Sequence, residues 1–233
     1  MPTVSVNGLQ MYYELRGEGQ PLALILGLGI DLSEWGIIIE PLMQRYQVIA
    51  FDNRGAGRTD KPDEPYTIEQ MAGDTNGLLR AIGVERADIL GISLGGRIAL
   101  ALTLAHPERV RRLVLVSTSA RTQRPWWFGL MSLLHALPVV QSKYPQLRYA
   151  FERQRAASTH YDCTDRLPQI HAPTLILHGR SDKIAPVALA EELRAGIPGA
   201  RLELFDGGHL FFLFRERQRF LDTVTAFLGA DLG

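Results

Sequence analysis

Cysteine, net charge and long apolar runs are all scarce in this sequence. The 233 residues include one cysteine, Cys163, so no disulfide can form within the chain and the thiol is expected to be a bystander. The 25 basic residues balance the 25 acidic ones, which leaves no overall charge to attract nucleic acid or an anionic membrane. No run approaches the ~20 apolar residues that span a bilayer, and the first residues lack a signal-peptide pattern. These absences predict a cytoplasmic protein that binds neither nucleic acid nor membranes.

Strand-like and helix-like segments alternate along most of the chain, whose length suits one large domain. Apolar runs at 22–26, 47–52 and 87–92 are typical of buried strands, and helical patterns follow them. Asn7-Gly8, between two strand-like segments, predicts a hairpin at the edge of the sheet. The alternation predicts an α/β fold with a mostly parallel, twisted sheet and helices on both faces. Three further strands are expected at 110–118, 173–179 and 200–207.

One region interrupts this alternation. Residues 121–169 show helical or irregular patterns and no strand pattern. We expect a core domain formed by 1–120 and 170–233, with 121–169 inserted as a short helical cap over the strand ends. The alternative is that the insertion extends the layer of helices.

Residues 91–96, GISLGG, include the end of the strand pattern 87–92 and lead into a helical one. A strand, the pattern G-x-S-x-G and a helix together are typical of a nucleophile elbow, in which the serine occupies a sharp, strained turn. Side chains at Gly91 and Gly95 would crowd that turn. The free N–H groups at the start of the helix would face any negative charge that develops at Ser93. We therefore expect Ser93 to be a nucleophile, the alternative being a small residue that packs in a glycine-rich loop.

A serine nucleophile needs a base within hydrogen-bond reach. The chain has six histidines, and His209 is the best candidate because it follows the strand pattern 200–207 in a glycine-rich turn. That turn lies at the carboxyl end of the sheet, the edge at which Ser93 is also expected. His178, at the end of the strand pattern 173–179, is expected to be a buried core histidine instead.

The acid that orients the base should also follow a strand. Asp182 lies in the loop after the strand pattern 173–179, although a surface carboxylate is the alternative. Asp206 is three residues before His209, too close along the chain to reach around the ring. Asp52 ends an earlier strand, next to Arg54, and is expected to hold its loop as an ion pair or turn residue. The resulting order of serine, aspartate and histidine is the order of α/β-hydrolases.

Two backbone N–H groups should form an oxyanion hole for a tetrahedral intermediate. Leu94, directly after the serine, is one expected donor. Leu28, between Gly27 and Gly29 in the loop after the strand pattern 22–26, is the other; a glycine-rich turn without a ligand role is the alternative. Gly27 and Gly29 are also candidates for substrate contact. So are Trp126 and Trp127 of the insertion, which could equally pack the cap on the core.

Six segments together make the chain resemble a known family: LGLGIDLSEW, FDNRGAGRTDKP, GISLGG, AHPERVRRLVLVST, PTLILHGRSDKIAP and FDGGH. They are similar to the α/β-hydrolase fold family that includes carboxylesterases, cofactor-free haloperoxidases (perhydrolases) and enol-lactone hydrolases. Nothing in the sequence suggests a metal, a nucleotide or a flavin, so no cofactor is expected. Relatives that cleave haloalkanes or epoxides have an aspartate where Ser93 stands, so those reactions are not expected. The chain departs from the family at Leu26, where a histidine is usual, at Thr59, where a serine is usual, and in its short insertion.

These observations predict a serine carboxylesterase of broad specificity that acts on small-molecule esters, as a monomer or a small homo-oligomer. One alternative is an enol-lactone or carbon–carbon bond hydrolase, or a perhydrolase. Basic residues in the insertion would favour a carboxylate substrate: Arg121, Arg124, Lys143, Arg148, Arg153 and Arg155. A solvated charged face is the simpler interpretation of them. A small-ligand receptor that retains the three residues is the non-enzymatic alternative.

Overall fold

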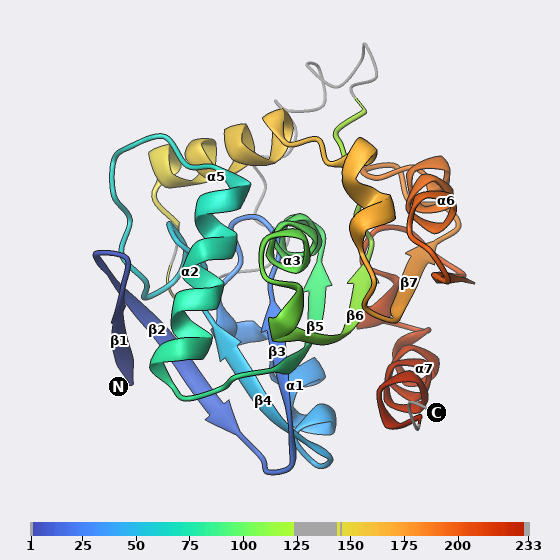
Figure 1. Cartoon of the computed structure of the whole chain (residues 1–233), viewed down its shortest axis with the longest axis horizontal. Helices are drawn as coiled ribbons and strands as arrows, with labels where there is room; N and C mark the ends of the chain where they lie inside the picture. Colours follow the sequence, from blue (N-terminus) through green and yellow to red (C-terminus); the bar gives the residue numbers. More distant parts are fainter. Residues whose placement is uncertain (1, 124–143, 145, 231–233) are drawn as a thin grey trace.

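A single eight-stranded sheet organises the protein, in the order β1-β2-β4-β3-β5-β6-β7-β8 (Figure 1). The computed structural model describes residues 2–123, 144 and 146–230. The strands are β1 (Thr3–Val6), β2 (Leu9–Arg16), β3 (Gln20–Ile25), β4 (Tyr46–Phe51), β5 (Ala87–Ile92), β6 (Val110–Val116), β7 (Thr174–Gly179) and β8 (Arg201–Phe205). From β4 to β8 every neighbouring pair is parallel, so the predicted mostly parallel sheet is confirmed.

The antiparallel edge of the sheet is the predicted hairpin. β1 and β2 pair antiparallel and β2 continues antiparallel onto β4. Asn7 and Gly8 both have positive φ, 50° and 79°, which is the geometry of a two-residue turn whose twist matches the strands.

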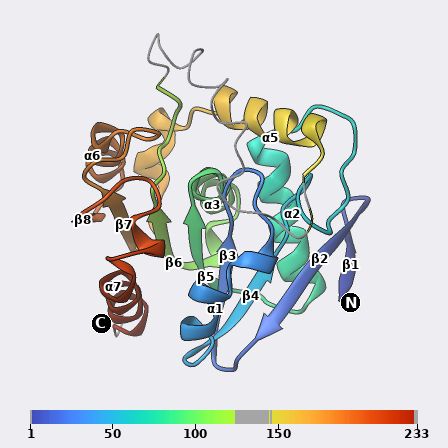
Figure 2. The same ribbon diagram turned by 180° about the vertical axis from the view of Figure 1, so that it is seen from behind.

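Helices cover both faces of the sheet (Figures 1 and 2). Side chains alternate along a strand, so β3 sends Ala23 and Ile25 to one core cluster and Leu22 and Leu24 to the other. The first cluster includes residues of α2 (Ile68–Ala81), α3 (Leu94–Ala105) and α6 (Val187–Gly196), together with Ala157. The second includes residues of α1 (Gly36–Leu42) and α7 (Arg217–Gly229). Within the described residues, no helix combines the length and apolar character that crossing a bilayer requires.

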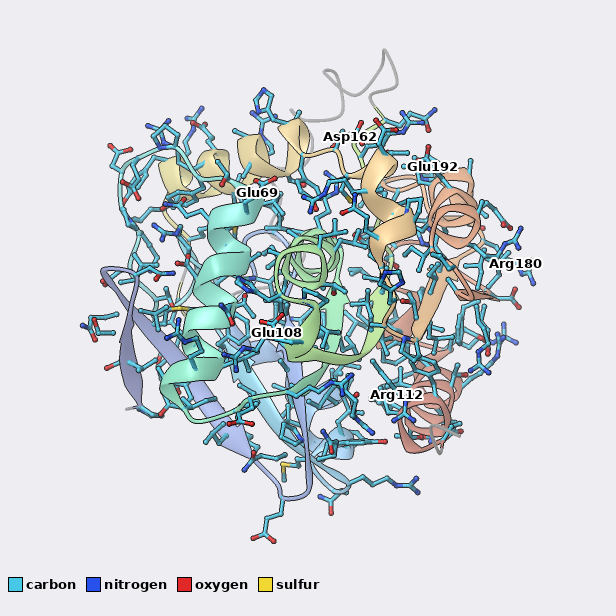
Figure 3. All side chains as sticks on the ribbon, viewed as in Figure 1. Glu69, Glu108, Arg112, Asp162, Arg180 and Glu192 are labelled. Carbon is cyan, nitrogen blue, oxygen red and sulfur yellow. The ribbon has the colours of Figure 1, made fainter. Side chains whose placement is uncertain are left out.

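The described part of residues 121–169 is mainly helical. It contains α5 (Arg148–His160), which runs across the top of α2 and α3 in Figure 1, and a 3₁₀ helix, Thr164–Gln169. At the base of this segment Arg121 forms an isolated β-bridge with Asp162 and an ion pair with Glu192 of α6, 3.1 Å (Figure 3). Trp126 and Trp127, which we considered as pocket residues, lie outside the described residues.

The buried side chain of Arg97 ties α5 to the core. Its guanidinium donates to the hydroxyls of Ser119, Thr122 and Ser158, and to the carbonyls of Arg121 and Ser158. Burial lowers the pKa of Arg97 to about 10, and it stays a cation at neutral pH. One side chain on the helix behind Ser93 therefore holds residues from both ends of the inserted segment.

Candidate active site

Ser93 occupies a strained turn between β5 and α3. Its backbone has φ 55° and ψ −116°, a conformation that a residue with a side chain rarely adopts. A Cβ at Gly91 would come within 2.5 Å of the carbonyl oxygen of Gly95. A Cβ at Gly95 would overlap the carbonyl oxygens of Ile25 and Leu26 at the end of β3. The two glycines therefore let the chain turn sharply while α3 starts against the sheet.

Ser93, His209 and Asp182 form one hydrogen-bonded chain. His209 Nε2 lies 3.0 Å from Ser93 Oγ, and His209 Nδ1 lies 2.8 Å from Asp182 Oδ2. The three residues follow β5, β8 and β7, so the carboxyl ends of three strands bring them together. In the tautomer that satisfies both contacts, Nδ1–H donates to the carboxylate and Nε2 accepts the hydroxyl proton of Ser93.

The carboxylate of Asp182 is oriented by its own loop. The N–H groups of Ile184 and Ala185 donate to Oδ1 at 2.8 and 2.9 Å, which turns Oδ2 toward His209. Burial alone would raise the pKa of Asp182, but the hydrogen bond and charge of His209, with the Ala185 N–H, hold it below its ordinary value. Asp182 is therefore ionised at neutral pH and can stabilise a positive charge on the imidazole.

His178 lies beneath this pair, fully buried. Its Nε2 is 2.7 Å from the carbonyl oxygen of Ala185 and 3.4 Å from Asp182 Oδ2. Burial lowers the pKa of His178, so the ring is neutral and its Nε2–H donates to Ala185. The expectation of a buried core histidine is confirmed, and the contact with Asp182 adds a role that its position at a strand end did not indicate.

The end of β6 supports both Ser93 and His209. The N–H of Ser93 donates to the carbonyl of Val116 at 2.9 Å, and the Thr118 hydroxyl donates to the carbonyl of Ser93 at 2.7 Å. The Ser117 hydroxyl donates to the carbonyl of His209 at 2.8 Å. Sequence reasoning missed these residues; the only available signal was a pair of hydroxyl side chains at the carboxyl end of a central strand.

The loop after β3 lies against Ser93. A Cβ at Gly27 would be 3.5 Å from Ser93 Cβ, so this position is at the site. Gly29 has φ 72°, and its N–H donates to Oε1 of Gln154 on α5 at 3.0 Å. Leu28 is half-buried between these glycines. Leu94 is the first residue of α3, so its N–H has no partner within the helix.

The loop after β4 contacts the loop after β3. Asp52 accepts hydrogen bonds from the N–H groups of Leu32 and Arg58, each at 2.8 Å, and from Arg58 Nε at 3.1 Å. It thus holds its loop, as expected, with Arg58 rather than the adjacent Arg54 as the ion-pair partner. Arg54 forms a buried, two-pronged ion pair with Asp74 of α2.

Other candidates for the acid and the base lie away from Ser93 or make different contacts. The side chain of Asp206 is 83% exposed and pairs with Arg180, which Figure 3 shows at the outer edge of the molecule. His106 follows the last residue of α3, and His160 is the last residue of α5. Among the described residues, no three histidine, cysteine, aspartate or glutamate side chains are grouped closely enough to hold a metal ion.

Comparison with known proteins identifies the family. A family model described as the alpha/beta hydrolase fold matches residues 20–159 and 141–216. A curated relative from Azorhizobium caulinodans, "Putative carbamate hydrolase RutD", is 32% identical, and the alignment covers 91% of this chain and 92% of that protein. The 2-hydroxymuconate semialdehyde hydrolase of Pseudomonas sp. strain CF600 is 30% identical over 91% of this chain and 88% of its own.

A solved structure leads to the same family. The enol-lactonase from Burkholderia xenovorans LB400 superposes with a TM-score of 0.86 at 29% identity, covering 98% of this chain and all of the other. The family model and the relatives match most of the length of the chain. We conclude that this protein belongs to the alpha/beta hydrolase fold family.

Proposed function

We propose that the protein is a serine hydrolase that cleaves carboxylic esters through an acyl-enzyme intermediate, with broad specificity. The observation that carries the proposal is the hydrogen-bonded chain from Ser93 through His209 to the ionised Asp182. A serine on a strained turn, a base in contact with it and a buried acid behind the base form the arrangement that nucleophilic catalysis requires.

In the first half of the reaction, Ser93 Oγ attacks the ester carbonyl while His209 Nε2 takes the hydroxyl proton. Asp182 stabilises the imidazolium that results and keeps its Nδ1–H pointed at the carboxylate. The backbone N–H groups of Leu28 and Leu94 stabilise the oxyanion of the tetrahedral intermediate. His209 then gives its proton to the leaving alkoxide, so that an alcohol departs and the acyl group stays on Ser93.

In the second half, a water molecule replaces the alcohol. His209 removes a proton from the water as it attacks the acyl carbonyl, and the same two N–H groups stabilise the second oxyanion. Collapse of this intermediate returns the proton from His209 to Ser93 and releases the carboxylic acid. No metal or cofactor enters these steps.

Three arginines that could attract a carboxylate substrate already pair with a carboxylate of the protein: Arg121 with Glu192, Arg148 with Glu152, and Arg153 with Asp63. These pairs support a neutral ester as the substrate, although exposed pairs of this kind are weak.

The second candidate function is hydrolysis of an enol-lactone or a carbon–carbon bond, with the same three residues. It is supported by the names of two similar proteins, an enol-lactonase and a 2-hydroxymuconate semialdehyde hydrolase. The name of the RutD relative, a putative carbamate hydrolase, suggests carbamates as a further class of substrate to test. If this candidate is right, substrates that carry a carboxylate will have a higher kcat/KM than neutral esters of matched size.

Substitution of the nucleophile tests the proposal. Ser93→Ala should lower kcat on short nitrophenyl esters by ~10⁴-fold or more, because the covalent step is lost. It should also abolish labelling by a fluorophosphonate, which reacts with activated serines. Ser5→Ala, at an exposed position on β1, is the control and should keep full activity.

Two results would contradict the assignment. The nucleophile is wrong if Ser93→Ala retains more than about a hundredth of wild-type activity, since triad removal costs far more. The protein is a receptor rather than an enzyme if the wild-type chain binds small acyl compounds tightly and turns none of them over.

A further inference from the structure

The helix α5 reaches the loop beside the nucleophile through a fully buried glutamine, Gln154. Its Oε1 accepts the N–H of Gly29 at 3.0 Å and an Nε2–H of Gln146 at 3.0 Å. Its Nε2 donates to the carbonyl oxygen of Arg54 at 2.6 Å. Only this orientation of the amide gives the Gly29 donor an acceptor and the Arg54 acceptor a donor, so the side chain has one favourable position.

The loop 27–29, to which Gln154 is hydrogen-bonded, has a flexible backbone. Gly27 and Gly29 flank Leu28, and glycine adopts left-handed and right-handed conformations with similar ease. The Leu28 N–H belongs to the peptide unit between Gly27 and Leu28, which can rotate at low cost because Gly27 is flexible. A hydrogen bond to the N–H of Gly29 fixes the next peptide unit, between Leu28 and Gly29, and so restricts the path of the chain on the far side of Leu28.

Side chains from outside the loop secure both of its ends. At the start, Asn53 Nδ2 donates to the carbonyl of Leu26 at 3.0 Å, while the Leu26 side chain itself is buried and apolar. At the end, Gln154 binds Gly29. The contact is close: a Cβ at Gly29 would lie 2.5 Å from Gln146 Oε1 and 3.0 Å from the Phe151 ring. The cap segment thus packs directly on the backbone of this loop.

We propose that Gln154 is a positioning residue, which holds the loop 27–29 so that the Leu28 N–H points at the oxyanion. Gln154 does not touch the substrate; it acts through the backbone and links the cap to the site. This inference rests on the proposed function, because a loop of this kind matters only if Ser93 forms tetrahedral intermediates.

A pair of variants on α5 tests the proposal. Gln154→Met keeps the length of the side chain and removes both its acceptor and its donor. Ser158→Ala removes a different bond between the same helix and the core, the one from Arg97 to the Ser158 hydroxyl. Each variant is assayed on a short nitrophenyl ester and for binding of an alkyl boronic acid, which forms a tetrahedral anion on the serine.

Gln154→Met should lower kcat by ~10- to 100-fold with little change in KM, somewhat less than complete loss of an oxyanion donor. Affinity for the boronic acid should fall by a similar factor, because it needs the same N–H groups. Ser158→Ala should keep kcat within about 2-fold of wild type, since it leaves the loop untouched. The proposal is overturned if both variants lose kcat equally, if the loss is mainly in KM, or if boronate affinity does not change.

Gln154→Glu provides a second test. A glutamate side chain keeps an oxygen that accepts the Gly29 N–H, the bond on which the proposal rests. Gln154→Glu should therefore retain most of the kcat and of the boronic acid affinity that Gln154→Met loses. Equal losses in the two variants would overturn the proposal.

The proposed function and the role of Gln154 can be contradicted separately. If the wild-type protein neither turns over esters nor reacts with a fluorophosphonate, the proposed function is wrong, and the inference falls with it. If the wild-type protein does both and Ser93→Ala does neither, a negative result with the Gln154 variants contradicts only the proposed role of Gln154.

Discussion

The two halves of the site are held in different ways. Ser93, His209 and Asp182 are fixed by the core: strained backbone at Ser93, two loop N–H groups on Asp182, and hydroxyls at the end of β6. The loop 27–29 is fixed by side chains from elsewhere, Gln154 of α5 and Asn53. The difference shows that strand-end loops suffice to align the serine, histidine and aspartate, whereas the loop 27–29 depends on side chains that pack over it.

The largest effect should come from a substitution in the hydrogen-bonded chain of Ser93, His209 and Asp182. Asp182→Asn should lower kcat by ~10⁴-fold, because the amide cannot hold the Nδ1–H tautomer or stabilise the imidazolium. Its control is Asp206→Asn, which changes a nearby but exposed carboxylate and should leave kcat unchanged. Steady-state kinetics on a nitrophenyl ester measures both. Equal activity of the two variants would exclude Asp182 as the acid.

A smaller effect is expected from removing a hydrogen bond that supports His209 only through its backbone carbonyl. Ser117→Ala removes the hydroxyl that donates to the carbonyl of His209, a bond worth about 1 kcal/mol. It should cost about that amount in unfolding free energy and lower kcat up to ~5-fold. Thr103→Val removes a buried hydroxyl bond within α3, far along the helix from the site, and serves as the control.

Urea unfolding and ester kinetics on this pair separate support of the site from general stability. Both variants should lose similar stability, and Ser117→Ala alone should lose activity. If Thr103→Val lowers kcat as much as Ser117→Ala does, the end of β6 has no special role in placing His209.

The smallest effect concerns the pH dependence of stability. The pKa of Asp182 is lowered in the folded protein, so its ionised form stabilises the fold above the unfolded pKa of ~4. That contribution is lost as pH falls through the lower, folded pKa. As the pH falls from 6 to 3, the Tm of the wild type should therefore decrease more than the Tm of Asp182→Asn. A difference that is independent of pH would contradict the lowered pKa.

Much of the fold follows from local patterns. The apolar run 87–92 coincides with β5, and the alternation of strands and helices predicts the parallel sheet. The positions of Ser93, Asp182 and His209 after three strands were sufficient to expect them at one edge, and the structure brings them within hydrogen-bond distance. Local patterns succeed here because parallel strands bring their carboxyl ends to the same edge.

The supporting residues could not be predicted in the same way. Gln154 meets Gly29 from 125 positions away in the chain, and Ser117 meets His209 from 92 positions away. A lone glutamine in a helix carries no pattern that distinguishes a buried anchor from a solvated side chain. Trp126 and Trp127 were chosen as pocket candidates on chemistry alone, and they stay predictions.

By itself, the sequence determined the local arrangement around Ser93: glycines that permit a strained serine, and a histidine and an aspartate that follow later strands. These are local requirements, since a turn accepts or rejects a side chain according to its nearest neighbours. Only the tertiary structure decided how the loop 27–29 is held. Its two glycines leave the backbone free, and the hydrogen bonds that restrict it come from Gln154 and Asn53, which the chain brings to that place only when α5 packs on the core.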